Sequence, residues 1–136
     1  MRHLWLRVGL GLLALAAADV GVWALAAPRS FYDDFPGGGR SWVSAVGPYN
    51  EHLVRDVGGL NLALAVLLLA AAVLLERRLV FVALAVYLVN AVPHFIFHVT
   101  HMDELSTGDQ VAQTVSLALA VVVPLALLPL ARRVET

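Results

Sequence analysis

The sequence predicts an all-α, polytopic membrane protein: a four-transmembrane-helix bundle with an outer interfacial loop. Hydrophobic residues make up 60% of the 136 residues and charged residues 14%, whereas ordinary soluble domains are roughly 45–50% apolar and about 25% charged. The apolar residues gather into four runs, each close to the length of about 20 residues that a helix needs to cross a bilayer. No length remains for a separate soluble domain, so we expect residues 1–136 to form a single domain.

The first predicted helix covers residues 4–27, where only Arg7 and Asp19 interrupt the apolar residues. The same stretch could serve as a cleaved signal peptide, because residues 24–26, Ala-Leu-Ala, resemble a small-residue cleavage site. We favour a retained helix, since Asp19 and Trp23 are unusual in a signal core and the apolar length suits a membrane span. Residue 28 lies on the outer side in either case.

Residues 28–48 are predicted to form the outer loop. Aromatic side chains alternate there with charged ones, and Pro36 leads into three consecutive glycines at 37–39. Amphipathic rings favour the headgroup region of a bilayer, so we expect short interfacial turns that lie over the helix ends. The segment is interpreted as a membrane-surface loop or, alternatively, as a lid.

The second predicted helix covers residues 49–75 and follows Pro48, a residue that suits a first helical turn. Gly58, Gly59 and Ala63 are small enough to let a neighbouring helix approach closely.

The third predicted helix covers residues 79–101 and follows a turn of only three residues, Glu-Arg-Arg. Because this turn is so short, the second and third helices should be antiparallel neighbours. The fourth predicted helix covers residues 108–131. Thr107 with Gln110 has the spacing of a capping box for its start, and Ser106 with Asp109 is the alternative.

The arginines predict how the four helices are oriented. With four spans, one side of the membrane carries Arg2, Arg7, Arg77, Arg78, Arg132 and Arg133, and the opposite loops carry only Arg29 and Arg40. Cytoplasmic loops are enriched in Lys and Arg. We therefore expect a multi-pass protein of the cell membrane with both termini in the cytoplasm.

Histidines gather at the outer end of the third helix. His94, His98 and His101 are spaced at i, i+4 and i+7, which places their imidazoles on one stripe of a helix. Further polar side chains open the second helix, namely Glu51, His52, Arg55 and Asp56. We expect His94 and His98, together with His52 or His101, to face a common polar cavity at the outer end of the bundle, with Asp56 or Glu51 beside them.

This set of side chains predicts a metal site. Imidazole nitrogens are preferred ligands of zinc, iron and copper, and carboxylates can complete the ligand set or orient the rings. A third ligand at i+7 lies about 10 Å along an ideal helix from the first, so all three need not bind together. The expected ligands are His52, His94, His98 and His101, and the expected catalytic or ring-orienting residues are Glu51, Arg55 and Asp56.

Other interpretations of the same residues stay open. The histidines could be interfacial groups bonded to carboxylates and water, or a haem could be held between His52 and a histidine of the third helix. Arg55 could contact an anionic or carbonyl-bearing ligand. It could also only neutralise Asp19 or Asp56, since an unpaired charge within a span is costly.

Composition argues against several function classes. The chain has no cysteine, which excludes disulfide exchange, thiolate catalysis and iron–sulfur clusters. A net charge of −1 with scattered arginines argues against a nucleic-acid surface. The glycines at 37–39 precede neither a lysine nor a strand–helix unit, so phosphate binding has weak support.

Two features of the sequence resemble known proteins. They are the four-span layout and the start of the second helix, Tyr-Asn-Glu-His-Leu-Val-Arg-Asp at residues 49–56. In these features the chain resembles bacterial integral membrane proteins of the DoxX-like four-helix families. The resemblance implies a four-helix membrane fold and assigns no catalytic residue. A thiol-redox role would not fit this cysteine-free chain.

Two hypotheses about function follow. An enzyme or metal-binding protein could act from the outer leaflet on a lipophilic small molecule, and a lipid-accessible cavity leading to the histidines would favour it. Alternatively, a non-catalytic accessory subunit could use its polar end to bind a partner, either in a homo-oligomer or with another membrane protein. A closed bundle with salt-bridged histidines would favour this second hypothesis.

Overall fold

The computed structural model describes residues 1–132, apart from the side chain of Arg2. Two members of the predicted cytoplasmic group, Arg133 and the Arg2 side chain, therefore lie outside the described part. The elements in chain order are α1 (Arg2–Ala26), α2 (Pro28–Asp34), β1 (Pro36–Gly37), β2 (Arg40–Ser41), the 3-10 helix η1 (Ser44–Val46), α3 (Glu51–Leu74), α4 (Arg77–Val99) and α5 (Thr107–Ala131).

Four of these helices, α1, α3, α4 and α5, are long and apolar enough to cross a membrane. The predicted all-helical class is confirmed, and the bounds of these helices agree with the predicted ones to within two residues. Asn50 caps α3 by accepting a hydrogen bond from the Leu53 backbone N–H at 3.1 Å, so Pro48 precedes the helix. Ser106 caps α5 by accepting from the Asp109 N–H at 3.2 Å. The predicted Thr107 cap is therefore wrong, and the alternative of Ser106 with Asp109 is confirmed.

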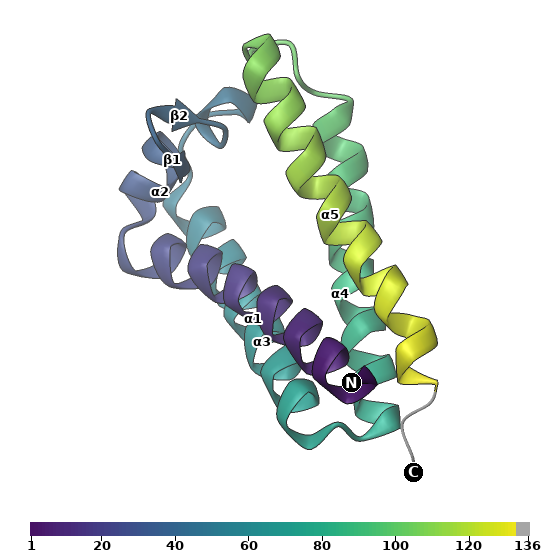
Figure 1. The fold of residues 1–136 in the computed structure, drawn as a ribbon. Helices are drawn as coiled ribbons and strands as arrows, with labels where there is room; N and C mark the ends of the chain where they lie inside the picture. Colours follow the sequence, from purple (N-terminus) through teal and green to yellow (C-terminus); the bar gives the residue numbers. More distant parts are fainter. Residues whose placement is uncertain (133–136) are drawn as a thin grey trace.

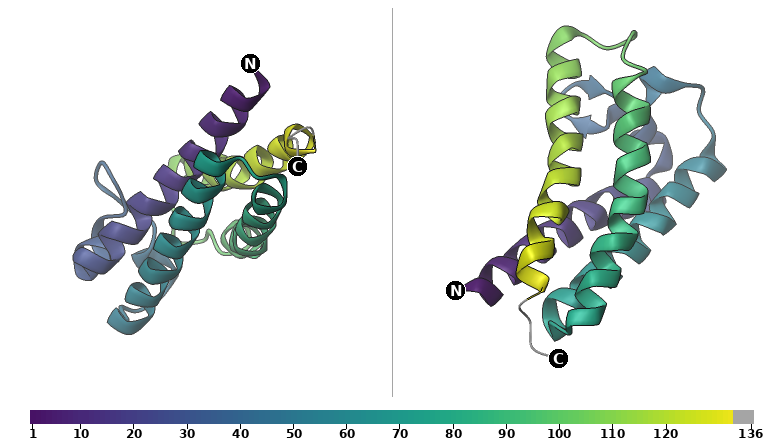
Figure 2. Two further views of the ribbon diagram at one scale, coloured as in Figure 1. Left: turned by 90° about the horizontal axis from the view of Figure 1, so that it is seen from below. Right: turned by 90° about the vertical axis from the view of Figure 1, so that its right-hand side faces the viewer.

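The long helices form two pairs that together make a V (Figures 1 and 2). α1 packs along α3, and α4 packs along α5. The pairs meet where α1 starts, α3 turns into α4 and α5 ends; we call this the joined end, and the opposite end the open end. The predicted bundle is therefore splayed, because the short turn keeps α3 and α4 together only near the joined end.

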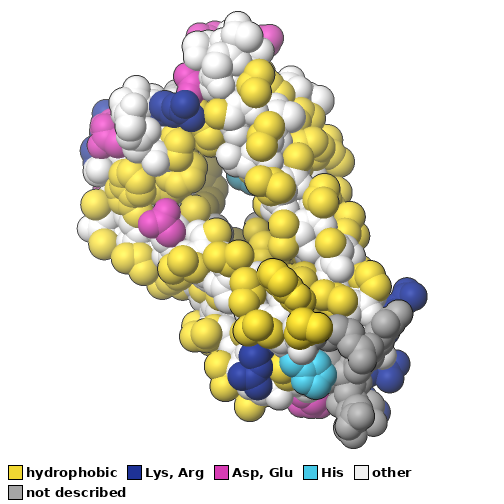
Figure 3. All heavy atoms as spheres, in the orientation of Figure 1, with side chains coloured by type: hydrophobic (Ala, Val, Ile, Leu, Met, Phe, Trp, Pro, Cys, Tyr) yellow, Lys and Arg dark blue, Asp and Glu magenta, His cyan; other side chains and the backbone are white. Residues whose placement is uncertain are grey.

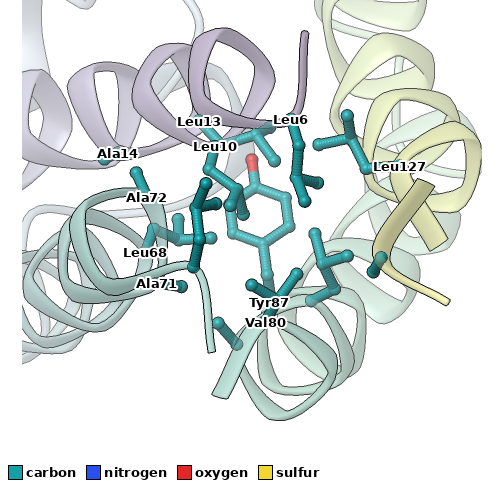
Figure 4. Close-up of a cluster of buried hydrophobic side chains, with 14 of the residues drawn as sticks. Leu6, Leu10, Leu13, Ala14, Leu68, Ala71, Ala72, Val80, Tyr87 and Leu127 are labelled. Atoms are coloured by element: carbon teal, nitrogen blue, oxygen red, sulfur yellow. The ribbon is translucent and has the colours of Figure 1, made fainter. Parts of the chain in front are cut away.

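One buried cluster of apolar side chains holds the joined end together (Figure 4). All four long helices contribute to it, so it fixes the vertex of the V. Its members include Leu6, Leu10 and Leu13 of α1, Leu68 and Ala71 of α3, Val80, Leu84 and Tyr87 of α4, and Leu127 and Ala131 of α5.

The α1–α3 pair is packed closely around two glycines. A Cβ atom at Gly58 would lie 2.8 Å from Leu25 Cγ and 3.1 Å from the Gly21 carbonyl oxygen, and one at Gly21 would lie 2.8 Å from the Leu62 side chain. A Cβ atom at Gly59 would meet nothing within 4 Å. The predicted role in close packing is thus confirmed for Gly58 and wrong for Gly59.

The segment between α1 and α3 contains more regular structure than the predicted loop. Its first part is the helix α2, whose sequence signal is Pro28 at the first helical position. The hairpin of β1 and β2 closes through Gly38 and Gly39, whose φ angles of 66° and 77° suit the central positions of a type I′ turn. We call residues 36–46, which comprise this hairpin and η1, the strap.

Candidate functional site

An open groove of about 420 Å³ lies between α3 and α4. Its lining is apolar apart from one amide, and consists of Leu60, Ala63, Leu64 and Leu67 of α3 and Val86, Val89 and Asn90 of α4. The space-filling view shows an opening between the two helix pairs, bordered by hydrophobic side chains (Figure 3). The space between the pairs is therefore accessible from the side.

The face of α4 that packs into the core becomes polar toward the open end. Tyr87 and Ala91 are buried, and His94 and His98 follow them on the same side of the helix. The two imidazole rings meet edge to face with their centroids 4.5 Å apart. His94 is exposed and His98 is half-buried, so the rings lie side by side as the i, i+4 spacing predicts.

One edge of the His98 ring is buried near α5. The amide of Gln113 lies beside this ring, and Gln113 itself is only 3% exposed. Neither His98 Nδ1 nor Gln113 Oε1 has a hydrogen-bond partner within residues 1–132. Gln113 was not among the predicted site residues, although a glutamine inside an apolar span was a signal that could have found it.

His101 lies beyond the end of α4 and makes local contacts. Its Nδ1 is 2.8 Å from the Phe97 carbonyl oxygen and 3.1 Å from Thr100 Oγ1. The imidazole also stacks on the Phe97 ring, with centroids 4.3 Å apart. These contacts hold His101 against the end of its own helix.

The predicted residues of α3 lie on the other arm of the V (Figure 1). His52 Nε2 is 3.3 Å from Asp56 Oδ2, and the His52 side chain is 88% exposed. Within residues 1–132, no three His, Asp or Glu side chains are grouped so that they could hold a metal ion. The four expected histidine ligands are thus not assembled, and His94 with His98 is the pair that lies together.

Arg55 joins the start of α3 to the end of α1. Its Nη2 lies 2.8 Å from Glu51 Oε1, and its Nη1 donates to the Leu25 carbonyl oxygen at 2.7 Å. The expectation that Arg55 pairs with Asp19 or Asp56 is wrong, since Glu51 is its carboxylate partner among the described ion pairs. Through these two contacts Arg55 links the first turn of α3 to the end of α1.

A second polar centre connects the strap to α5. Asp109 Oδ1 accepts a hydrogen bond from Trp42 Nε1 at 2.9 Å and lies 3.3 Å from Arg40 Nε. Asp109 Oδ2 accepts from Ser106 Oγ at 2.7 Å. Sequence reasoning missed this centre because Trp42 and Asp109 are 67 positions apart.

α2 is held near the start of α3 by aromatic and charged groups. Arg29 Nε lies 2.6 Å from Asp33 Oδ2, and this hydrogen bond raises the pKa of Arg29. The same guanidinium lies 4.9 Å from the centroid of the Tyr49 ring. Partial burial, together with the nearby Glu51 carboxylate, raises the pKa of Tyr49.

Comparison with protein families, with curated proteins and with solved structures found no match. The proposed function is therefore based on the residues and geometry of this chain.

Proposed function

We propose that the protein crosses the membrane four times, with its joined end in the cytoplasm, and binds a lipophilic small molecule that reaches it sideways from the outer leaflet. Arg7, Arg77, Arg78 and Arg132 near the joined end support this orientation. An impermeant thiol reagent tests it in intact cells: the variant Glu104→Cys should react and Arg77→Cys should not. Equal reaction at both positions would contradict the orientation.

The groove between α3 and α4 is the observation that carries the binding proposal. Its apolar lining suits a hydrocarbon body, and it is open to the side, where lipid would surround the helices. Among the described lining residues the one polar side chain is Asn90 on the α4 wall, and His94 and His98 follow it one and two turns further along α4. A ligand with one polar group would place its body against α3 and its polar group against α4.

A photoreactive long-chain alcohol, with a diazirine at the far end of its chain, tests the binding site in phosphatidylcholine nanodiscs. Labelling mapped by mass spectrometry should concentrate on Leu60 and Val89. It should be weaker at Leu15 and Val122, which are exposed but do not line the groove. Excess 1-dodecanol should suppress the groove labelling. Uniform labelling of all exposed apolar residues would show that the probe only dissolves in lipid, and would contradict the proposal.

Substitutions of the histidine pair test whether these two side chains contact the ligand. His94→Leu and His98→Leu should each weaken the competition by 1-dodecanol, because each removes a polar contact from the α4 wall. His3→Leu is the matched control, since His3 lies at the joined end. Competition that stays the same in both α4 variants would show that the histidines do not contact the ligand.

A metal ion is a second candidate ligand, because the His94 and His98 rings are close enough to offer two imidazole nitrogens to one ion. Zinc, iron and copper accept such ligands, and water or the lipophilic molecule would complete the coordination. Elemental analysis of protein purified without chelators tests this candidate. Bound metal that is lost in His94→Ala would support it, whereas protein that stays metal-free after loading with all three ions would contradict it.

A further inference from the structure

Two buried polar atoms lie without partners on neighbouring side chains of α4 and α5, next to the histidine pair. They are Nδ1 of His98 and Oε1 of Gln113, and neither bonds to any other group within residues 1–132. The Gln113 side chain is nearly fully buried and lies beside the His98 ring. The other ring nitrogen of His98, Nε2, is not among the buried unpartnered atoms, so it is on the accessible side.

The two buried atoms match each other in only one tautomer of the histidine. An amide oxygen only accepts hydrogen bonds, whereas one nitrogen of a neutral imidazole donates and the other accepts. Buried polar groups are rarely left without a partner, because their lost hydration is then not replaced. With a proton on Nδ1, His98 can donate to the amide oxygen of Gln113, and this one hydrogen bond satisfies both atoms.

We propose that Gln113 is a positioning residue that accepts the Nδ1 proton of His98, so that Nε2 of His98 becomes the acceptor for the hydroxyl group of an uncharged lipophilic alcohol or phenol. The partner of one ring nitrogen commonly fixes the state of the other nitrogen in histidine sites. Gln113 thus acts on the ligand through His98 and does not touch the ligand itself.

The class of ligand rests on the proposed function, and it follows from the role of His98 Nε2 as a hydrogen-bond acceptor. A ligand that meets Nε2 must donate a hydrogen bond, which a hydroxyl group does and an ether or ester oxygen does not. The groove lining contains no charged side chain among the described residues. A charged headgroup would therefore lose its hydration in the groove without gaining a counter-ion.

The tautomer can be read directly from the wild-type protein. In protein labelled with ¹⁵N-histidine, in nanodiscs of dioleoylphosphatidylcholine, Nδ1 of His98 should give the resonance of a protonated nitrogen and Nε2 that of an unprotonated one. The signals of His98 are identified by their loss in His98→Gln. A protonated Nε2 in the wild type would overturn the role of Gln113, and this measurement requires no variant of Gln113 to fold.

Replacing Gln113 with leucine removes the acceptor at a similar side-chain volume. The tautomer with a proton on Nε2 should then become populated. Ser116→Ala is the matched control, because Ser116 is exposed on α5 and bonds only to the Ala112 carbonyl oxygen of its own helix. An unchanged His98 spectrum in folded Gln113→Leu would overturn the positioning role.

1-Dodecanol and its methyl ether test the ligand class, since the ether has the same chain and no donor. The alcohol should bind about tenfold more tightly, as expected for one hydrogen bond, and should shift the Nε2 resonance. Equal binding of both would overturn the ligand class and leave the proposed function standing. Binding of neither, together with uniform photolabelling, would contradict the proposed function, while the His98 spectrum would still decide the role of Gln113.

Discussion

At Asp109, groups from two distant parts of the chain meet on one carboxylate. Trp42 and Arg40 come from the strap, and Ser106 from the turn before α5. The Arg40 side chain is 45% exposed and Asp109 23%, so solvent weakens their ion pair. The hydrogen bond from Trp42 is the stronger tie, because Trp42 is buried and its indole N–H donates to an ionised oxygen at 2.9 Å.

We expect Asp109→Ala to release the strap from α5. Trp42 then loses its acceptor and Arg40 loses its partner, so spin labels at Val46→Cys and Glu104→Cys should report a longer and broader distance distribution. Asp109→Asn keeps an oxygen for Trp42 and should have a smaller effect. Asp103→Ala, in the exposed turn before α5, is the control and should leave the distribution unchanged. A strap that stays in place in Asp109→Ala would show that its own packing holds it.

Arg55 shows which residue contacts can be predicted from sequence. On a helix, residues i and i+4 are neighbours whereas i and i+1 diverge, so Glu51 was the better candidate partner and Asp56 a poor one. The same rule correctly placed the rings of His94 and His98 together. The bond from Arg55 to the Leu25 carbonyl oxygen depends on how α1 meets α3, and no local pattern encodes that.

Among the elements, the α1–α3 pair depends on a close approach at Gly58. We expect Gly58→Ala to destabilise the protein by about 1–3 kcal/mol, the usual effect of overpacking, because the new Cβ would lie 2.8 Å from Leu25 Cγ. Gly59→Ala is the matched control on the same helix. It meets no neighbour within 4 Å and should be neutral or stabilising by up to about 1 kcal/mol, since alanine favours helix over glycine.

Thermal unfolding in detergent, followed by circular dichroism, measures both glycine variants. Equal unfolding midpoints for Gly58→Ala and Gly59→Ala would show that α1 can move away from α3 without loss of stability.

The long helices were predictable as elements because their apolar runs and caps are local features. Asn50 and Ser106 mark the starts of α3 and α5, and the runs fix the lengths. α2 was missed, since its seven residues are too few for a periodic pattern. The contact between the strap and α5 brings together segments far apart in the chain, which sequence spacing does not reveal.

At the scale of the whole molecule, the V was not predictable. Helices that are apolar on every side carry little information about which face packs and which meets lipid. The short turn at residues 75–76 fixes the joined end only. The divergence beyond it separates His52 from His94 and His98, and it also creates the lateral access on which the proposed function depends.

The divergence should persist in a bilayer, and the cysteine-free chain makes it measurable. Spin labels at Leu53→Cys and Phe97→Cys report the open ends of α3 and α4, and labels at Leu74→Cys and Val82→Cys report the joined end; all four side chains are exposed. Packed helices lie about 8–10 Å apart, so a closed bundle would give similar separations for both pairs. We expect a clearly longer distance at the open end in phosphatidylcholine nanodiscs. Equal distances would show that the helix pairs close together in lipid, and would remove the lateral route to His94 and His98.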